Sequence, residues 1–373
     1  MEYRHTSMSL RDLGLILMGV VGVGLFSAAC TYQVPELSVE VHRGEDWWND
    51  AWSQRIRITF QNADGESLTD FPVLVRLDGQ RLPGLTASSM GADLRFVDDD
   101  GQTILLHEID RWAANGESFV WVRVPRIDAT ATDHMWLYYG NPEASDTQSA
   151  NDLWNGFIGV YHLSPSQSVP AQFVNSAGSN AGSWDNDVPG GIAAGQIGDA
   201  VVLDGARFVH IGDNGEVATD PGEARTAEAW INASNLQAQA VVYEEGQCVG
   251  WFLGMNANGE YLGSFITESI LPLCGEGSTE YLATAPAAAG TWHYLTLVVD
   301  RPGLEMRLFV DGILQTVTAI NNTDVADGNG VFRIGSDHDG GMGTFVGSID
   351  EVRVSNNARS ATWIAAQYKS MSG

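Results

Sequence analysis

The sequence predicts an all-β protein built of two β-sandwich domains. The chain has 373 residues, which suits two domains of about 150 residues each. Its apolar residues recur in short runs, many with the period of two that is typical of strands packed on one face. The 42 glycines are spread along the chain and suit the many tight turns that such strands need. No long helix-period segment interrupts this pattern before the C-terminal end.

Residues 47–150 are expected to form the first domain. Turn-forming sequences such as NADGES, DDDGQT and GNPEAS separate its apolar runs. The runs alternate or are apolar throughout, and so predict strands over 55–60, 71–77, 93–97, 119–124 and 134–139.

Residues 156–373 are expected to form the second domain. Short strands follow one another at regular spacing here, as in a sandwich or jelly roll. Asp311 and Gly312 predict a two-residue hairpin turn, because Asp-Gly accepts the positive φ angles of a type I′ turn. Near the C-terminus, Ser360 is expected to cap the start of a short helix.

The N-terminal segment predicts export. The apolar run over 13–26 is shorter than the about 20 residues of a membrane span, but it suits the core of a signal peptide. FSAAC, which ends at Cys30, resembles the lipobox of bacterial lipoproteins, and this implies a signal peptide over 1–29 and a lipid on Cys30. Residues 30–46 are polar and predict a tether. The expected location is the bacterial cell envelope, as an outer-membrane lipoprotein, with secretion after cleavage at Ala29 as the alternative.

The net charge limits the kinds of binding partner, and the cysteines predict a disulfide. The net charge of −28 repels nucleic acid and anionic lipid headgroups and tolerates cations such as Ca²⁺. The protein is therefore expected to contact the membrane only through its N-terminal lipid. With Cys30 lipidated, Cys248 and Cys274 form an even set in an oxidising compartment. They predict a disulfide that would stabilise the fold by about 3 kcal/mol.

Motifs in both halves resemble known families. WWNDAWSQRIRITF, HEIDRWAANGESFVWVRVP and LYYGNP are similar to DUF2341, a family of exported β-domains without an established activity. LDGARFVHI, TAEAWINAS, GTWHYLTLVVD and GSIDEVRVSNNARSATWIAAQY resemble the laminin-G-like, concanavalin A-like jelly-roll domains. The second resemblance implies a domain that binds glycans or proteins at cell surfaces, often with Ca²⁺. Some relatives of this tandem carry a TolQ/ExbB-type membrane segment.

The adjacent carboxylates of Asp350 and Glu351 raise the question of catalysis. Strand alternation predicts that Ile349, Glu351 and Arg353 share one face, and that Asp350 lies on the other. Two carboxylates that point apart cannot flank one glycosidic bond. Glu351 and Arg353 are instead expected to form a solvated ion pair.

A metal role for Asp350 follows only from the resemblance. Related jelly-roll glucanases end in a similar D-x-V-R-V strand, whose Asp binds a structural Ca²⁺ together with backbone carbonyls. This implies one Ca²⁺ on Asp350, with the carbonyl of Gly205 or Gly156 as a further ligand. The alternative is an Asp350 that accepts backbone hydrogen bonds or pairs with an arginine.

The remaining candidates are weaker. Glu108 and Asp110 share a face in HEIDRW, but Trp112 and Ala113 follow where a jelly-roll glucanase carries its second Glu; an ordinary strand role with Arg111 or a turn donor is expected. Aromatic rings and polar loop groups are the other means of binding sugars. Those in Gly-rich or polar segments are the predicted ligand rim, namely Trp184, Trp251, Asp337 and Asp339.

The sequence as a whole favours a non-catalytic binding module in the cell envelope, with carbohydrate as its ligand. It contains no nucleophile elbow, zinc-protease motif or phosphate-binding loop. A structural or adhesive protein that binds another protein, or an accessory to a TolQ/ExbB-type system, is the second hypothesis. A glycoside hydrolase is the third.

Overall fold

The computed structural model describes most of the chain after the N-terminal segment. The described residues are 39–41, 46–60, 62, 66–78, 90–113, 116–129, 133–164, 172–185, 188–213, 223–246, 249–267, 279–321, 331–337 and 343–372. Residues Val34–Gly373 form one compact unit. No helix among the described residues has the length and apolar character needed to cross a membrane.

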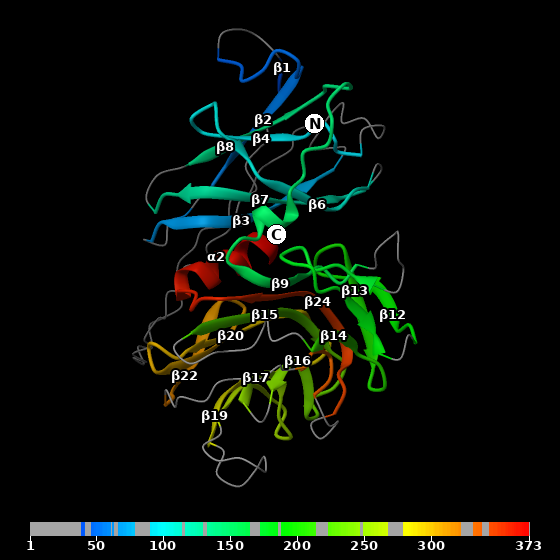
Figure 1. The fold of residues 1–373 in the computed structure, drawn as a ribbon, viewed down its shortest axis with the longest axis vertical. Helices are drawn as coiled ribbons and strands as arrows, with labels where there is room; N and C mark the ends of the chain where they lie inside the picture. Colours follow the sequence, from blue (N-terminus) through cyan, green and yellow to red (C-terminus); the bar gives the residue numbers. More distant parts are fainter. Residues whose placement is uncertain are drawn as a thin grey trace, which may run out of the picture. The chain divides into compact units, whose positions relative to one another are not determined.

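The first β-region is a sandwich of a five-stranded and a three-stranded antiparallel sheet (Figure 1). The larger sheet has the order β1-β2-β8-β4-β5, from β1 (Val39–Val41), β2 (Gln54–Thr59), β8 (His134–Tyr139), β4 (Arg95–Asp98) and β5 (Ile104–Leu105). The smaller has the order β3-β7-β6, from β3 (Leu68–Leu77), β7 (Ser118–Ile127) and β6 (His107–Arg111). The sequence predicts a tether over 30–46, but Val39–Val41 within that range form β1 and pair with β2.

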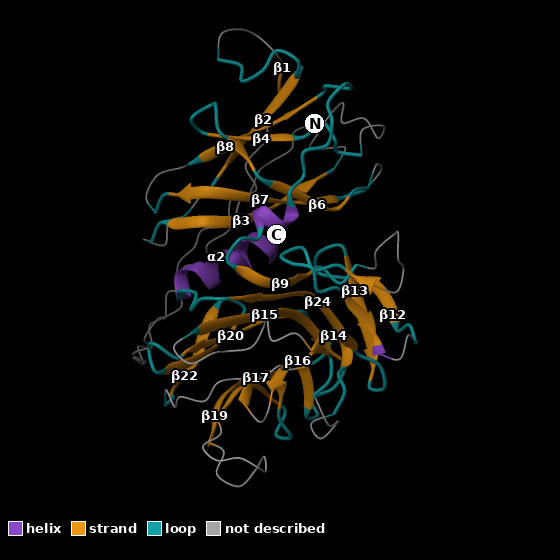
Figure 2. Ribbon diagram, viewed as in Figure 1, coloured by secondary structure: helices purple, strands orange, loops and turns teal. Residues whose placement is uncertain are grey.

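The second β-region is a sandwich of two eight-stranded sheets, as predicted for a jelly roll (Figure 2). One has the order β10 (Gln172–Phe173), β11 (Gly182–Trp184), β14 (Val209–Asp213), β23 (Val331–Ile334), β16 (Gln239–Gly246), β17 (Val249–Met255), β18 (Glu260–Thr267), β19 (Thr279–Pro286). The other has the order β12 (Gly191–Ala194), β13 (Asp199–Asp204), β24 (Val346–Ser355), β15 (Ala224–Ala233), β20 (His293–Asp300), β21 (Glu305–Val310), β22 (Ile313–Ala319), and β9 (Phe157–Tyr161) also pairs with β24. The all-β prediction is confirmed.

Two predicted local features are also confirmed. Asp311 and Gly312 adopt φ angles of 52° and 74° between β21 and β22, as a type I′ hairpin turn requires. The C-terminal helix α2 (Ala361–Ser372) begins after Ser360, whose Oγ accepts the backbone N–H of Trp363 at 3.1 Å. A second, single-turn helix, α1 (Ala150–Leu153), lies in the connection between the two β-regions.

The hydrophobic cores join the two β-regions. One core fills the space between the two eight-stranded sheets. Another begins inside the first sandwich and continues, through α2 and β9, onto the outer face of the sheet that holds β24 (Figure 1). Phe71 of β3, Trp121 of β7, Trp230 of β15 and Trp363 of α2 all belong to this second core. The two regions therefore share buried apolar surface, which is the dominant stabilising contribution in folding.

Candidate functional site

Strand β24 changes its partner at the two carboxylates that the sequence singled out. Along one edge, β13 pairs with β24 as far as Ile349, and β9 pairs with it from Val352 onward. On the other edge, β15 advances two residues, from Glu228 to Trp230, while β24 moves three, from Arg353 to Asp350. This is a β-bulge, and Glu351 takes the positive φ of 50° within it.

The bulge places Asp350 and Glu351 on the same face, so the prediction that they face opposite ways is wrong. Oδ2 of Asp350 accepts the backbone N–H of Ile197 at 2.8 Å, and Asp350 pairs across the sheet with Trp230. Ile197 and Trp230 belong to the core on the outer face of this sheet. Glu351 contacts His162 on that face as well. Alternation holds only for regular strands, and the extra residue of a bulge interrupts it.

His162 is the centre of a buried polar cluster that joins both β-regions. It directly follows β9, and its Nδ1 donates to Oε1 of Glu351 at 2.7 Å. Its Nε2 faces Oε2 of Glu108, on β6 of the first region, at 3.4 Å. Glu108 also accepts hydrogen bonds from Ser176 Oγ and Trp154 Nε1, both at 2.6 Å. No sequence motif marks His162, because its partners Glu351 and Glu108 lie 189 and 54 residues away along the chain.

Arg353 completes the cluster. Its Nη2 donates to Oε2 of Glu351 at 2.5 Å, and both side chains are 0% exposed. Its guanidinium lies 4.1 Å from the ring centroid of Trp121 and 4.9 Å from that of Trp154. The ion pair was correctly expected, but it is buried rather than solvated. We call Glu108, Asp110, His162, Glu351 and Arg353 the joint cluster.

The electrostatics of the joint cluster favour a protonated histidine. Burial opposes the charged form of His162, but Glu351, Asp110 and Glu108 together raise its pKa well above the usual value. Burial likewise opposes ionisation of Glu108 and Glu351, yet His162 lowers the pKa of both, helped at Glu351 by Arg353. An imidazolium can donate from both ring nitrogens, and each nitrogen here faces a carboxylate.

Two further carboxyl groups lie beside these ion pairs and hold protons more tightly. Burial, with Glu351 and Glu108 as like charges, raises the pKa of Asp110 to about 7. Burial and the neighbouring Glu351 raise the pKa of Asp350 well above its usual value. Like charges in a poorly solvated site cannot all ionise. Both carboxyl groups therefore keep their protons to a higher pH than an ordinary aspartate does.

Neither a metal site nor a catalytic dyad fits the joint cluster well. Asp110, His162 and Glu351 can bring one ligand atom each within 4.8 Å of one another. However, the 2.7 Å between His162 Nδ1 and Glu351 Oε1 is the length of a hydrogen bond, and the proton that bond requires would have to leave for a metal to bind. Both oxygens of Glu351 are engaged and its side chain is wholly buried, so no sugar reaches it. The cluster is best suited to fastening the two β-regions together.

Glu108 and Asp110 differ from their expected roles. The sequence predicts ordinary strand contacts for them, with Arg111 or a turn donor. Instead Glu108 binds His162, Ser176 and Trp154, and Arg111 lies 3.6 Å from Asp199. Oδ2 of Asp110 is buried without a hydrogen-bond partner among the described residues.

The structure does not bring Asp350 and Gly205 together. Gly205 follows Asp204, which pairs with Val346, four residues along β24 from Asp350. At about 3.3 Å per residue, the two lie on the order of 13 Å apart. Ca²⁺ takes six to eight oxygen ligands, whereas Oδ2 of Asp350 already accepts the backbone N–H of Ile197, and its charged neighbours include His162 as well as the carboxyl groups of Glu351 and Asp110. A calcium site using both residues is not formed.

The predicted rim aromatics lie in the core instead. Trp184 is 3% exposed and packs edge-on against Phe173, and Trp251 is 1% exposed and packs on Phe332. Each lies on a strand whose inward-facing side chains fill the sandwich. The neighbouring Gly-rich and polar residues suggested loops instead of strands at these positions. Asp337 is largely buried, and its carbonyl accepts from Arg333. Cys30, Cys248, Cys274 and Asp339 lie outside the described residues.

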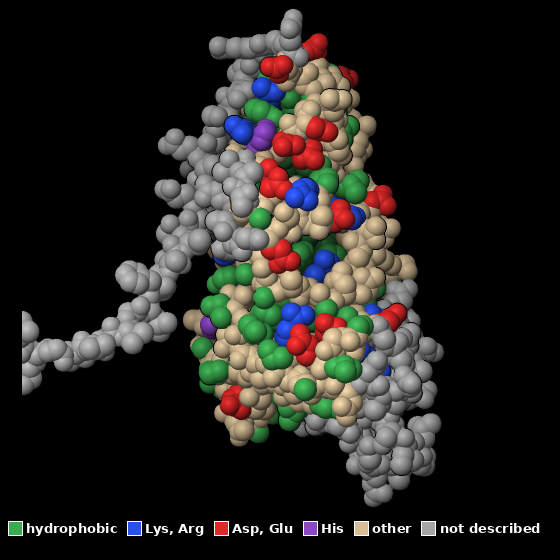
Figure 3. Space-filling model, turned by 90° about the vertical axis from the view of Figure 1, so that its left-hand side faces the viewer, with side chains coloured by type: hydrophobic (Ala, Val, Ile, Leu, Met, Phe, Trp, Pro, Cys, Tyr) green, Lys and Arg blue, Asp and Glu red, His purple; other side chains and the backbone are tan. Residues whose placement is uncertain are grey.

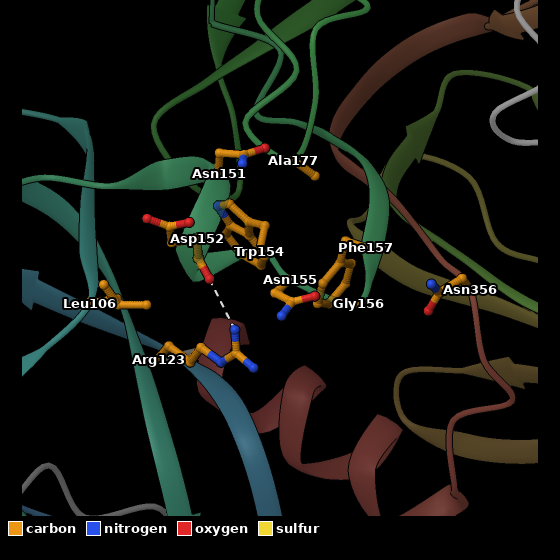
Figure 4. A pocket seen from close by; sticks show the side chains of 10 residues that line it. All are labelled: Leu106, Arg123, Asn151, Asp152, Trp154, Asn155, Gly156, Phe157, Ala177 and Asn356. Atoms are coloured by element: carbon orange, nitrogen blue, oxygen red, sulfur yellow. Dashed lines mark hydrogen bonds between the residues drawn. The ribbon is translucent and has the colours of Figure 1, made fainter.

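Three adjoining hollows at the surface form the second candidate site. They have volumes of about 470, 630 and 640 Å³. Phe157 or Ile158, at the start of β9, lines each of them, and neighbouring hollows share Asn151, Ala177 or Asn356. Leu106 and Arg123 of the first region form one wall (Figure 4). We call these three hollows together the seam groove.

Comparisons with known proteins agree with the two resemblances. Residues 90–162 match the model of DUF2341, a domain of unknown function. Residues 204–365 match the model of the concanavalin A-like lectin/glucanases superfamily. The two families occur in the predicted order. No curated protein matches the chain.

Several solved structures are similar to part of the chain at low sequence identity. Domain 4 of AbnA, a GH43 extracellular arabinanase from Geobacillus stearothermophilus solved with arabinotriose, is 18% identical, with a TM-score of 0.41 over 56% of this chain and 97% of that domain. The binding domain of Paraclostridial Mosquitocidal Protein 1 is 12% identical, with a TM-score of 0.46 over 59% and 53%. The receptor binding domain of botulinum neurotoxin D is 14% identical, with a TM-score of 0.42 over 59% and 53%. The chain thus spans about half of each toxin domain.

Proposed function

We propose that this protein is a non-catalytic carbohydrate-binding module of the bacterial cell envelope. The observation that carries the proposal is the burial of the carboxylates on β24 within a region that matches a lectin and glucanase superfamily. A glycosidase needs two carboxyl groups on either side of an accessible glycosidic bond. Asp350 and Glu351 are both 0% exposed; both oxygens of Glu351 and Oδ2 of Asp350 accept hydrogen bonds from other parts of the chain.

The surface also suits a neutral ligand better than an anionic one. Acidic and basic side chains are interspersed over the face drawn in Figure 3, and the net charge of the chain is −28. No cationic patch is drawn on the described part of that face. This agrees with a polysaccharide ligand and with the exclusion of nucleic acid.

Binding is tested with a glycan array probed by the full chain, with and without EDTA. We expect retention on a set of neutral glycans. An unchanged pattern in EDTA would show that binding needs no divalent cation, and loss of binding in EDTA would show that it does. Capture of a surface protein together with a blank array would favour the adhesive alternative.

Anchoring through Cys30 is a separate part of the proposal, supported by the FSAAC sequence. Metabolic labelling with palmitate tests it in a bacterial host. We expect label on the wild-type chain and none on Cys30→Ala. Normal processing without label in the wild type would show a secreted protein instead.

A further inference from the structure

We propose that the seam groove binds uncharged oligosaccharide and that both β-regions contribute to the site. This inference rests on the proposed function and gives it a location and a ligand class. It starts from four asparagines at the groove, Asn151, Asn155, Asn356 and Asn357, which line its hollows. Figure 4 shows three of them around one hollow.

The amide side chains of these asparagines are available to a ligand. All four residues are exposed, and none of their side chains makes a hydrogen bond to another described residue. An amide offers two donors and one acceptor oxygen without a net charge. Sugar hydroxyls both donate and accept, so amides spaced along a depression match a chain of sugars. Three hollows in succession favour an oligosaccharide over a single sugar.

The charges that line the groove argue against an anionic ligand. Three carboxylates, Asp152, Glu223 and Asp300, lie among the lining residues together with two arginines. Arg123 donates to Asp70 at 3.1 Å and to the carbonyl of Asp152 at 2.9 Å (Figure 4). Arg225 donates to Glu223 at 2.6 Å. Both cations are thus already paired, and the groove offers no free positive charge from its described residues to a uronate or sulfate.

The joint cluster lies directly beneath the groove and holds it in shape. Trp154 lines the groove, is 0% exposed, and donates its indole N–H to Glu108. The backbone N–H of Asn356 donates to the carbonyl of Gly156 at 3.2 Å, and this fixes β9 against the end of β24. Gly156 has a φ of 94°, where a side chain would be strained. A preformed site loses less entropy on binding.

The two-region construction of the groove gives the first region a role in binding. Arg123 lies on β7 and supports the 151–155 segment, whereas Asn356 and Asn357 directly follow β24. Neither region alone presents both walls. The binding site therefore requires both β-regions in one chain.

Affinity electrophoresis of the full chain tests this inference. The gels contain arabinan, xylan or mixed-linkage β-glucan as neutral probes, and polygalacturonate as an anionic one. We expect retardation by at least one neutral probe and none by polygalacturonate. The double variant Asn155→Ala/Asn356→Ala should lose at least tenfold in affinity for that neutral probe, because it removes two of the four amides.

The matched control is Asn258→Ala, which removes an exposed amide in the turn between β17 and β18 and should bind like the wild type. Melting temperatures of all variants exclude misfolding. Full binding by the double variant would refute the groove and leave the proposed function standing. Binding to polygalacturonate alone would overturn the ligand class. No retardation by any probe would count against the proposed function itself.

Discussion

Glu351 is the residue on which the joint cluster depends. It receives His162 on one oxygen and Arg353 on the other, and all three side chains are buried. Replacing a buried ion pair as a whole can be neutral, but removing one partner leaves an uncompensated charge. The same residue carries a left-handed backbone conformation, so the chain accepts local strain here to place the carboxylate.

Glu351→Gln should therefore destabilise the protein by about 3–5 kcal/mol. Its neutral amide leaves Arg353 and His162 without their shared counter-charge. Urea unfolding followed by tryptophan fluorescence measures the change. Glu143→Gln, at an exposed position, is the control and should change the free energy of unfolding by less than about 0.5 kcal/mol. Equal effects of the two substitutions would contradict the structural role of Glu351.

Asp110 gives the joint cluster a distinctive dependence on pH. Its pKa rises from an ordinary 3.8 to about 7 in the folded chain, so the folded state holds this proton more tightly than the unfolded state. Its contribution to stability is present at low pH and is lost as the pH rises from about 4 to about 7. His162, whose pKa is also raised, loses its contribution in the same direction, above its ordinary value of 6.5.

Asp110→Asn should flatten this dependence, because an amide resembles the protonated acid at every pH. The stability of the variant relative to the wild type should increase from pH 4 to pH 7 and then level off. Melting temperatures at intervals of half a pH unit test the prediction. A difference between the two proteins that stays constant over this range would show that Asp110 titrates normally.

At the scale of elements, the sequence predicted regular features well and the exceptions poorly. The hairpin at Asp311-Gly312 and the cap at Ser360 have local causes, and both are confirmed. The bulge at Glu351 arises where β13 ends and β9 begins beside β24. The pattern of apolar and polar residues within one strand does not reveal such a change of the paired strand. The same holds for Trp184 and Trp251, whose burial depends on strands far away in the sequence.

Helix α2 is the element that covers the outer face of the β24 sheet toward the first region. Leu74 of β3 donates its backbone N–H to Ser370 of α2, and Trp363 packs against Phe71 at 5.4 Å between ring centroids. Ser360→Ala removes the side-chain cap and should cost about 1 kcal/mol. Ser360→Thr keeps a capping hydroxyl and should cost less. Chemical unfolding compares the two, and equal losses would mean that the cap contributes nothing.

At the scale of the whole molecule, the two β-regions should unfold together. The core that contains Phe71, Trp121, Trp230 and Trp363 crosses between them, and the joint cluster adds ion pairs across the same boundary. A shared core makes unfolding cooperative. Scanning calorimetry should show one transition whose van't Hoff and calorimetric enthalpies agree. Two separate transitions would show that the regions are independent domains.

The site was less predictable than the fold. The composition, the turns and the motifs sufficed for an all-β tandem, because each depends on neighbours in sequence. The joint cluster needs residues 108, 162 and 351 to meet, and the seam groove needs 123, 155 and 356. Both sets come together only through the packing of one β-region on the other, for which one sequence holds no local signal.

The most direct test of a binding function without catalysis measures binding and hydrolysis of a polysaccharide in the same sample. The full chain is incubated with the neutral polysaccharide that retards it most, and both the bound fraction and the reducing ends released are measured over a day. We expect saturable binding with no reducing ends above the protein-free blank. Steady release of reducing ends by the wild type, abolished in Glu351→Gln or Asp110→Asn variants that remain folded, would show that the buried carboxylates are catalytic.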